Sequence, residues 1–306
     1  DSEGRSAYFL SVNRNKRSVV ADLDREEDRE LLARLIDGAD VVVDNFRRGT
    51  LERRGMSPEA ALGARPSLIW CTISGFGPES GRPGYDFVVQ AESGWMAITG
   101  EPEGAPMKTG VALADVIAGK DAAIAILAAL VARARTGLGR RVHISLAHSA
   151  ASALVNVAQN ALVSGNDARR WGNAHPNLVP YQPFETADRP IVIAVGSDAQ
   201  WLALVRALGL DELSRDARLQ TNAGRLAHRA TVVATLSARL LTAGAAHWLA
   251  RLEAAGVPCG IVRSVLEALE GSDASARTGV PPSVPGRVRY PPPRLDEHGD
   301  IVRRRG

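Results

Sequence analysis

The sequence predicts an α/β protein in which a large domain with a parallel sheet precedes a smaller α/β domain. Three observations support this. Short apolar runs alternate with helical stretches over the first third of the chain, a connection rich in Gly, Pro and Asn follows near the middle, and further strand and helix patterns come after it. Strands separated by helices are typical of a parallel sheet covered on both faces. A chain of 306 residues is long enough for two domains.

The elements of the large domain follow from these patterns. We predict, in chain order, a strand at 18–23, a helix at 25–36, a strand at 41–44, a helix from 58, a strand at 68–73, a helix at 117–136, a strand at 141–145 and an Ala-rich helix to about 162. Ser57 before Pro58 is a typical helix start. Gly137 is expected to end the long helix. Because open sheets bind ligands at the carboxyl ends of their strands, we expect the site there.

Composition sets the domain boundaries. We place the large domain at 1–165, a linker at 166–190, the small α/β domain at 191–265 and a Pro-rich C-terminal segment at 266–306. Within the small domain we predict a strand at 191–195, a helix at 198–208, helices near 229–241 and 245–255, and a strand at 258–262. The Pro-rich stretch from 271 is expected to be extended.

Charge and cysteine content narrow the function classes. The formal charge is only +3, and no basic cluster is interleaved with aromatic residues, so no nucleic-acid partner is expected. Cys71 and Cys259 are too few for a disulfide framework, and the six histidines lack metal-ligand spacing, so we expect no metal site. No apolar run approaches the roughly 18 residues of a membrane span. These features favour a cytoplasmic protein. Because the chain starts at Asp1, an N-terminal portion is expected to be missing.

Asp115 is the residue that the pattern singles out. It lies in the apolar run GVALADVIAG at 110–119, where the most strongly helical segment begins. A carboxylate among apolar neighbours needs a cap, a partner or a chemical role. Two interpretations remain open, and both can hold at once. In the first, Asp115 is a cap or first-turn acid favoured by the helix dipole. In the second, it is a nucleophile whose charge is held by N–H groups at that helix start.

Basic and glycine-rich segments indicate where an anion would bind. The segment NRNKR at 13–17 fits either a polar turn or a phosphate site. Four arginines after the strand at 41–44 fit either a solvated face or a nucleotide-phosphate site; they are Arg47, Arg48, Arg53 and Arg54. The glycine-rich loop at 75–84 is neither a P-loop nor a dinucleotide-binding fingerprint, which disfavours a nicotinamide cofactor.

Taken in order, these segments resemble the class III CoA-transferases, the family of formyl-CoA transferase, carnitine CoA-transferase and α-methylacyl-CoA racemase. The motifs that carry the resemblance are 8–9, 13–18, 44–46 with Gly49 and Leu51, 74–77, 83–86 with Gln90, 99–100, 110–115, 128–130, 135–139, and 291–295 with His298. The resemblance implies a Rossmann-like large domain built from both chain ends, a smaller domain from the middle, and an interlocked homodimer. The resemblance also implies an opening βα portion, which is expected to precede Asp1.

In this family the catalytic aspartate falls on Asp115. The resemblance implies that its carboxylate attacks an acyl-CoA thioester to give an acyl-aspartyl anhydride, and that the released CoA then forms an aspartyl-CoA thioester that an acceptor acid resolves. Coenzyme A thioester is then a substrate, with no permanently bound cofactor. The implied CoA-contacting residues are Asn13, Arg14, Asn15, Lys16, Asn45, Phe46, Arg47, Arg53, Ser74, Gly75, Phe76 and Gly77. Ser74 stands where formyl-CoA transferase has a lysine, which puts one CoA contact in doubt.

Tyr85 distinguishes the two chemistries of the family. The racemase branch partners the aspartate with a His directly before a second Asp, and here that position holds Tyr85, before Asp86. A Tyr with a pKa of about 10 is a poor proton shuttle at neutral pH. The sequence therefore favours transfer. The alternatives are a racemase-like enzyme and a truncated non-catalytic paralogue, which the missing opening portion would support.

The segment RRWGNAH at 169–175, with VPYQ at 179–182, is similar to the branch that uses succinyl-CoA and short dicarboxylates such as glutarate. Arg170 and His175 are candidates to contact a distal carboxylate, and they equally fit local contacts in a linker. We therefore predict an acyl-CoA:carboxylate CoA-transferase, with succinyl-CoA as a candidate donor and a small carboxylic or dicarboxylic acid as acceptor.

Overall fold

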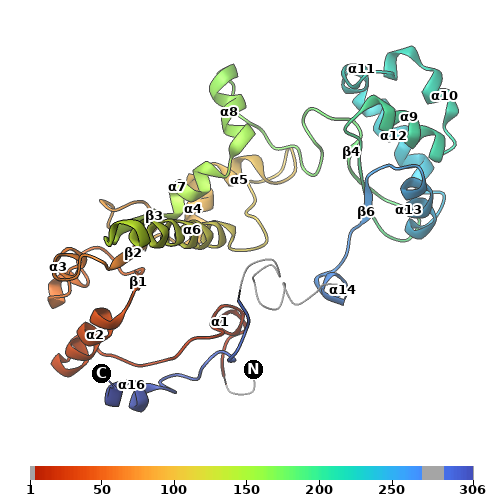
Figure 1. The fold of residues 1–306 in the computed structure, drawn as a ribbon. Coiled ribbons are helices and arrows are strands. Elements are labelled where there is room, and N and C mark those ends of the chain that lie inside the picture. Colours follow the sequence, from red (N-terminus) through yellow and green to blue (C-terminus); the bar gives the residue numbers. More distant parts are fainter. Residues whose placement is uncertain (1–3, 271–285, 306) are drawn as a thin grey trace. The chain divides into compact units, whose positions relative to one another are not determined.

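The computed structural model describes residues 4–270 and 286–305. The chain divides into two compact units (Figure 1). Unit 1 comprises Asp1–Ile98, Pro106–Ala168 and Ser272–Gly306, and unit 2 comprises Thr99–Ala105 and Arg169–Gly271. Each unit combines helices with a three-stranded sheet, so the predicted α/β class is confirmed.

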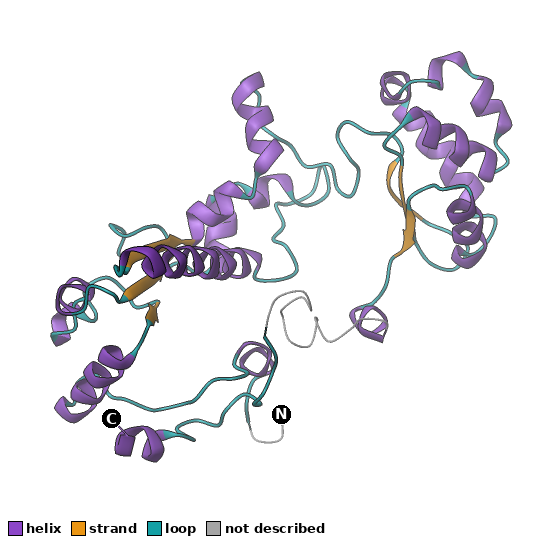
Figure 2. Ribbon diagram, in the orientation of Figure 1, coloured by secondary structure: helices purple, strands orange, loops and turns teal. Residues whose placement is uncertain are grey.

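The sheet of unit 1 is parallel, as predicted. Its strands are β1 (Val41–Asp44), β2 (Ile69–Ser74) and β3 (Arg140–Ser145), in the order β1-β2-β3 (Figure 2). The strand predicted at 18–23 is wrong. That segment instead follows the C-terminal part of the chain, where the Val20 N–H donates to the Asp296 carboxylate (2.8 Å) and the His298 N–H donates to the Ser18 carbonyl (3.0 Å). Side-chain partners here replace a strand ladder.

The two faces of this sheet differ. Ile73 and Ile144 lie on one face and pack with Ala114 and Ala118 of α6 (Leu113–Thr136). On the other face the register aligns Asp44 with Thr72 and Thr72 with His143. That face is covered beside Trp70, which packs with Ala61 and Leu62 of α3 (Pro58–Ala64). At the carboxyl edge this face carries polar residues at every second position, and Thr72 among them is buried.

Helix α6 begins four residues before the predicted position 117 and ends as predicted. At its start, Ala112 makes no side-chain cap bond, and a carboxylate oxygen of Asp86 instead accepts from the N–H groups of Ala114 (2.8 Å) and Asp115 (3.3 Å). At its end, Gly137 adopts φ 72° and donates its N–H to the Arg133 carbonyl. A left-handed residue in this position favours glycine, which explains the stop.

The remaining helices of unit 1 are mostly short. They are α1 (Ala7–Val12), α2 (Glu26–Gly38), the 3-10 turn Glu52–Arg54, α4 (Asp86–Glu92), α5 (Trp95–Ile98), α7 (Leu146–Ser152), α8 (Val155–Ser164) and α16 (Gly299–Arg305). Helices α2 and α3 were predicted, and Ser57 caps α3 by accepting from the Ala60 N–H. The single Ala-rich helix expected to reach 162 is two helices, α7 and α8.

Unit 2 contains an antiparallel sheet of β4 (Tyr181–Phe184), β5 (Ile191–Ala194) and β6 (Cys259–Ile261). Strand β4 lies inside the range 166–190, which we had expected to be a linker. The helices are α9 (Asp198–Ala207), α10 (Asp211–Arg215), α11 (Asn222–Ala227), α12 (Arg229–Leu240), α13 (Ala245–Ala254) and α14 (Val265–Glu270), with a 3-10 turn at Ala217–Leu219. Helices α9, α12 and α13 confirm the predicted helices.

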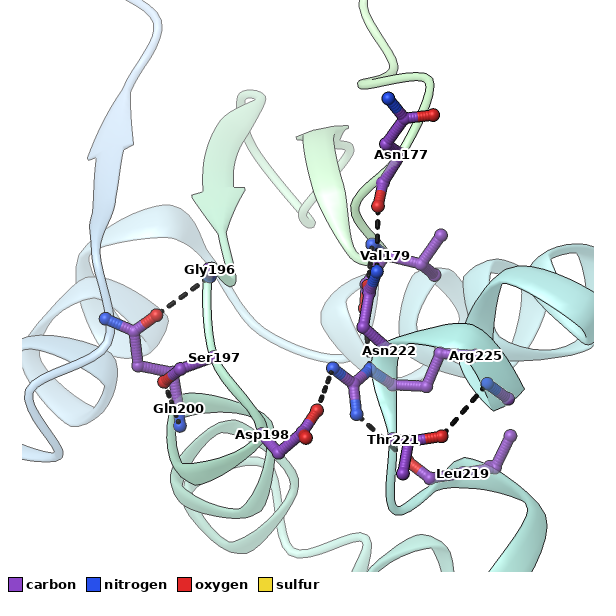
Figure 3. Close-up of polar contacts among 11 residues, drawn as sticks. Asn177, Val179, Gly196, Ser197, Asp198, Gln200, Leu219, Thr221, Asn222 and Arg225 are labelled. Atoms are coloured by element: carbon purple, nitrogen blue, oxygen red, sulfur yellow. Dashed lines mark hydrogen bonds and ion pairs between the residues drawn. The ribbon is translucent and has the colours of Figure 1, made fainter.

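A buried arginine organises the polar side of unit 2. The Arg225 guanidinium donates to the carbonyls of Val179 (2.8 Å) and Leu219 (3.0 Å) and pairs with Asp198 (2.8 Å) (Figure 3). It lies over the buried Trp201 ring. These contacts satisfy a charge that burial would otherwise disfavour. The Pro-rich stretch predicted to be extended begins at 271, and its residues 271–285 lie outside the described residues. Residues 286–298 form neither helix nor strand, whereas Gly299–Arg305 form α16, so the extended prediction is wrong there. Among the helices that are described, none is long and apolar enough to cross a membrane.

Candidate active site

A cleft of about 770 Å³ opens at the carboxyl edge of the parallel sheet in unit 1. It brings together residues that are far apart in the sequence, and the predicted site residues among its lining are Asn45, Phe46, Arg47, Ser74, Gly75, Gly77, Tyr85 and Asp115. A smaller hollow of about 510 Å³ shares Asn45, Phe46 and Asp115 and extends toward Ala118 on α6. Asp115 therefore lies where two hollows meet, at the strand ends that the sequence indicated.

Asp115 is the third residue of α6 and is exposed toward the cleft. Among the described residues its carboxylate has no hydrogen-bond donor or cationic partner. Loss of hydration within the cleft raises the pKa of the Asp115 carboxyl, and the nearby charge of Asp86 raises it further. Asp115 is thus a first-turn acid of α6 and not its cap, because Asp86 provides the cap. Its role as a nucleophile stays a prediction.

A brace from α4 holds the start of α6. The second carboxylate oxygen of Asp86 accepts from the Gln90 side-chain amide at 2.6 Å. The Gln90 side chain is buried, and its carbonyl oxygen accepts from the Thr109 N–H at 2.9 Å. Sequence reasoning names both residues only within a motif that resembles the family and assigns them no structural role, although their spacing of four places them on one helix face. Together they fix the backbone on both sides of the turn that carries Asp115.

The glycine-rich loop forms one wall of the cleft because two glycines cross. A Cβ atom on Gly75 would overlap the backbone of Gly84, and one on Gly84 would overlap that of Gly75. Only glycine permits this approach. The loop between them is fixed further by Arg82, whose guanidinium lies 4.2 Å from the Phe76 ring centroid and pairs with Glu92. Phe76 thus supports the wall and is not among the residues that line the cleft.

Polar strand residues line the floor of the cleft. One Asp44 oxygen accepts from the Trp70 indole N–H (2.7 Å) and the Thr72 hydroxyl (2.6 Å). His143 Nε2 and Ser74 Oγ are 2.9 Å apart. Burial, reinforced by the charge of Arg141, holds the pKa of the His143 ring below its ordinary value. Sequence reasoning missed Asp44 and His143, and the alternation of polar residues along β2 and β3 is the signal that could have indicated this floor.

The arginines around the cleft differ in their availability. Arg48 pairs with Glu79 at 2.8 Å. Arg141 approaches Glu59 to 3.9 Å, and one of its buried terminal nitrogens has no hydrogen-bond partner. Within the part of the chain that the structure describes, the Arg47 guanidinium makes neither a hydrogen bond nor an ion pair. Arg47 therefore lines the cleft with a guanidinium that is available to a ligand. Arg53 lies in the 3-10 turn Glu52–Arg54, outside the lining.

The N-terminal motif 13–16 does not line this cleft. Asn15 has φ 62° and its side-chain oxygen accepts from the N–H groups of Arg289 (2.6 Å) and Tyr290 (3.0 Å). The Lys16 ammonium donates to the Asn13 side chain at 3.1 Å, and the Arg14 guanidinium donates to the Ser11 carbonyl. In this structure the motif joins the two ends of the chain. Its contact with CoA stays a prediction.

The two residues predicted to meet a dicarboxylate lie in unit 2. The His175 ring packs on Tyr181 with centroids 5.1 Å apart, and its Nδ1 accepts from the Asn177 N–H. The Arg170 guanidinium donates to the carbonyls of Glu101 (3.1 Å) and Gly104 (2.8 Å). Both side chains make local contacts, and their role toward substrate stays a prediction. No group of three or more metal-ligating side chains is found among the described residues.

Comparison with known proteins agrees with these features. The model of CoA-transferase family III matches residues 1–298. The succinate–glutarate CoA-transferase of Agrobacterium fabrum is 39% identical, over 97% of this chain and 80% of that protein. The succinyl-CoA:glutarate CoA-transferase of Mus musculus is 36% identical, over 96% and 72%. The crystal structure of a CaiB/BaiF family protein from Brucella suis, 39% identical, superposes with a TM-score of 0.88 and covers 100% of this chain and 86% of its own. The chain therefore belongs to CoA-transferase family III and is a CoA-transferase.

Proposed function

We propose that the protein moves CoA from an acyl-CoA donor to a small carboxylic acid, with Asp115 as the nucleophile. The observation that carries this proposal is an unpaired carboxylate, exposed at the meeting point of two hollows, at the carboxyl edge of a parallel sheet. A partly dehydrated carboxylate binds a proton more tightly than a fully hydrated one, and it is also the stronger nucleophile. The raised pKa of Asp115 therefore supports this role.

The chemistry needs no net proton transfer. An Asp115 oxygen attacks the thioester carbonyl carbon, the C–S bond breaks, and CoA leaves as a thiolate from an acyl-aspartyl anhydride. The thiolate attacks the aspartyl carbonyl, which releases the donor acid as a carboxylate and leaves an aspartyl-CoA thioester. The acceptor carboxylate attacks this thioester, which expels the CoA thiolate and forms a second anhydride between the acceptor and Asp115. The thiolate then attacks the acceptor's carbonyl carbon, which forms the new acyl-CoA and releases the Asp115 carboxylate. One negative charge is conserved throughout.

The absence of a proton step agrees with the neighbours of Asp115. Burial holds the pKa of His143 below its ordinary value, and Ser74 engages its Nε2. Tyr85 lines the cleft with 73% of its surface exposed. A racemase-like reaction would require one of these groups to exchange a proton with a substrate carbon. We therefore assign Tyr85 to substrate contact within transfer chemistry.

For CoA we propose contacts with Asn45, Phe46 and Arg47 on one side of the cleft and with the loop Ser74–Gly77 on the other. Arg47 is the strongest candidate for a phosphate contact because its guanidinium has no partner among the described residues. Residues 13–16 and Arg53 complete the proposed CoA contacts at the edges of unit 1.

We further propose succinyl-CoA as donor and a short dicarboxylate as acceptor, on the strength of the names of the two relatives above. An interlocked homodimer is also proposed. Large apolar side chains of α6 are exposed in the single chain, and they are Val116, Ile124, Leu127 and Val131. A helix that is apolar on its outer face needs a cover, which a second chain would supply.

An exchange assay tests the proposal. Succinyl-CoA is mixed with glutarate, and new acyl-CoA is followed by mass in the parent protein and in Asp115→Ala. We expect glutaryl-CoA from the parent and at least a roughly 1,000-fold loss in the variant, as for other removed nucleophiles. Full turnover by Asp115→Ala would refute the assignment. Solvent deuterium entering the α-carbon of an acyl-CoA would instead favour the racemase, and CoA binding without any exchange would favour a non-catalytic paralogue.

A further inference from the structure

Two arginines of unit 2 share one tryptophan. The guanidinium carbon of Arg169 lies 4.2 Å from the ring centroid of Trp171, and that of Arg229 lies 5.2 Å from it. Arg169 precedes the ring by two positions, whereas Arg229 begins α12. The Trp171 ring is only partly buried, so the cluster is open to solvent.

Within the ranges that the structure describes, neither of these guanidiniums forms an ion pair with an acid. Arg229 uses one terminal nitrogen to donate to the carbonyls of His175 (3.0 Å) and Pro176 (2.9 Å). Its other N–H groups, and the whole Arg169 guanidinium, have no hydrogen bond or ion pair among the residues that the structure describes. Burial and the neighbouring charge of Arg169 lower the pKa of Arg229, which shows that the two cations act on each other. Like charges held together attract an anion.

Hydrogen bonds hold the loop that carries the cluster. The Gly172 N–H donates to the Gly100 carbonyl, and the His175 N–H donates to the Tyr181 carbonyl, both at 3.0 Å. The Asn222 side chain donates to the Asn177 carbonyl at 2.8 Å. A ligand would therefore not need to order this loop, which lowers the entropic cost of binding.

We propose that Arg169, Trp171 and Arg229 form a binding site for the carboxylate of a small organic acid. Planar guanidinium groups match the two oxygens of a carboxylate, and Trp171 holds both guanidiniums in place by stacking. The choice of carboxylate rests on the proposed function, in which free organic acids are substrates. The site differs from the predicted pair Arg170 and His175, whose polar groups already make local contacts.

A binding titration without acyl-CoA tests this site separately from catalysis. Glutarate is added at constant ionic strength while Trp fluorescence is recorded, in the parent and in Asp115→Ala. We expect saturable binding of equal affinity in both proteins. Arg169→Gln should weaken it by about tenfold or more, the usual effect of losing a charge-assisted hydrogen bond. Arg169 is exposed and its only described side-chain contact is with Trp171, so this variant should fold.

Matched variants and ligands complete the test. Arg229→Lys keeps the charge but loses the planar fork and should bind with intermediate affinity. Arg251→Gln is the control, because its guanidinium lies 5.8 Å from the centroid of Trp248, a fully buried ring. Unchanged affinity in Arg169→Gln, no saturation in the parent, or equal binding of inorganic phosphate would overturn the proposal. Saturable glutarate binding by a parent protein that catalyses no exchange would count against the proposed function alone.

Discussion

At the scale of single residues, Asp115 and Asp86 show how one helix start can serve two carboxylates. Asp86 accepts both available N–H groups and so takes the stabilisation that a helix start offers to an acid. Asp115 is left without that compensation, and its pKa rises. The site thus holds an acid whose charged form is less favoured than that of a free aspartate, as functional sites commonly do.

Asp86→Asn separates the charge of Asp86 from its capping role. The amide oxygen can still accept from Ala114, so the helix start should be retained. Removing the charge lowers the pKa of Asp115 toward its ordinary value. Because the attacking group is the ionised carboxylate, the acid limb of kcat/KM for CoA transfer should shift to lower pH.

The pH profile of transfer, measured beside Asp86→Ala, checks this prediction. The alanine variant loses both the cap and the acceptor for Gln90 and should be destabilised by about 1 kcal/mol or more, whereas Asp86→Asn keeps the cap, loses the acceptor for Gln90 and should be destabilised less. An acid limb that stays in place in both variants would show that Asp86 does not act on the nucleophile.

At the scale of elements, the crossing of Gly75 and Gly84 gives the cleft its shape. Alanine at either position would force two backbones apart, so we expect a loss of about 1–3 kcal/mol in unfolding free energy and a large loss of transfer activity. Gly81, in the same loop, has open space around it. Gly81→Ala should therefore behave like the parent in thermal unfolding and in the exchange assay. Equal effects at all three positions would argue against the crossing.

The pattern of apolar residues predicted the helices and strands that depend on contacts close in sequence or on regular strand pairing. The strands β1, β2 and β3 and the long helix α6 follow from apolar runs and glycine stops in the sequence. The segment 18–23 has the same apolar look, but its partners lie near residues 296–298, which no local pattern reveals. Short helices such as α4 were missed because helices of one or two turns depend on tertiary contacts.

Sequence reasoning predicted part of the cleft lining and none of the contacts that support it. The motifs that resemble the family placed Asp115, Asn45 and the loop at 74–77, and the structure brings them to one cleft. His143 and Asp44 were missed because their role depends on strand register. Likewise, the use of Asn15 to hold residues 287–290 is a contact across almost the whole sequence.

At the scale of the whole molecule, each unit has its own core. The core of unit 2 includes Trp201, Leu236 and Trp248. Residues 99–105 belong to this unit although they precede α6, and the bond from Gly172 to Gly100 joins them to it. Domain boundaries placed by composition cannot detect a short segment that leaves one unit to join the other.

The buried arginine of unit 2 gives a test of that core. Arg225→Ala leaves the carbonyls of Val179 and Leu219 and the Asp198 carboxylate without their donor, and should cost about 3–5 kcal/mol. Chemical denaturation measures the change. Arg215→Ala, at an exposed position of the same unit, should change the unfolding free energy by less than about 0.5 kcal/mol. A small effect of Arg225→Ala would mean that water replaces the lost contacts.

The covalent role of Asp115 is the central claim, and trapping the aspartyl-CoA thioester tests it most directly. The protein is incubated with succinyl-CoA alone, quenched in acid, digested and examined by mass spectrometry. The account predicts that a peptide containing residues 110–119 gains the mass of CoA less one water, and that Asp115→Asn gives no such peptide. CoA attached to a different residue, or acyl exchange that continues at the parent rate in Asp115→Asn, would contradict the account.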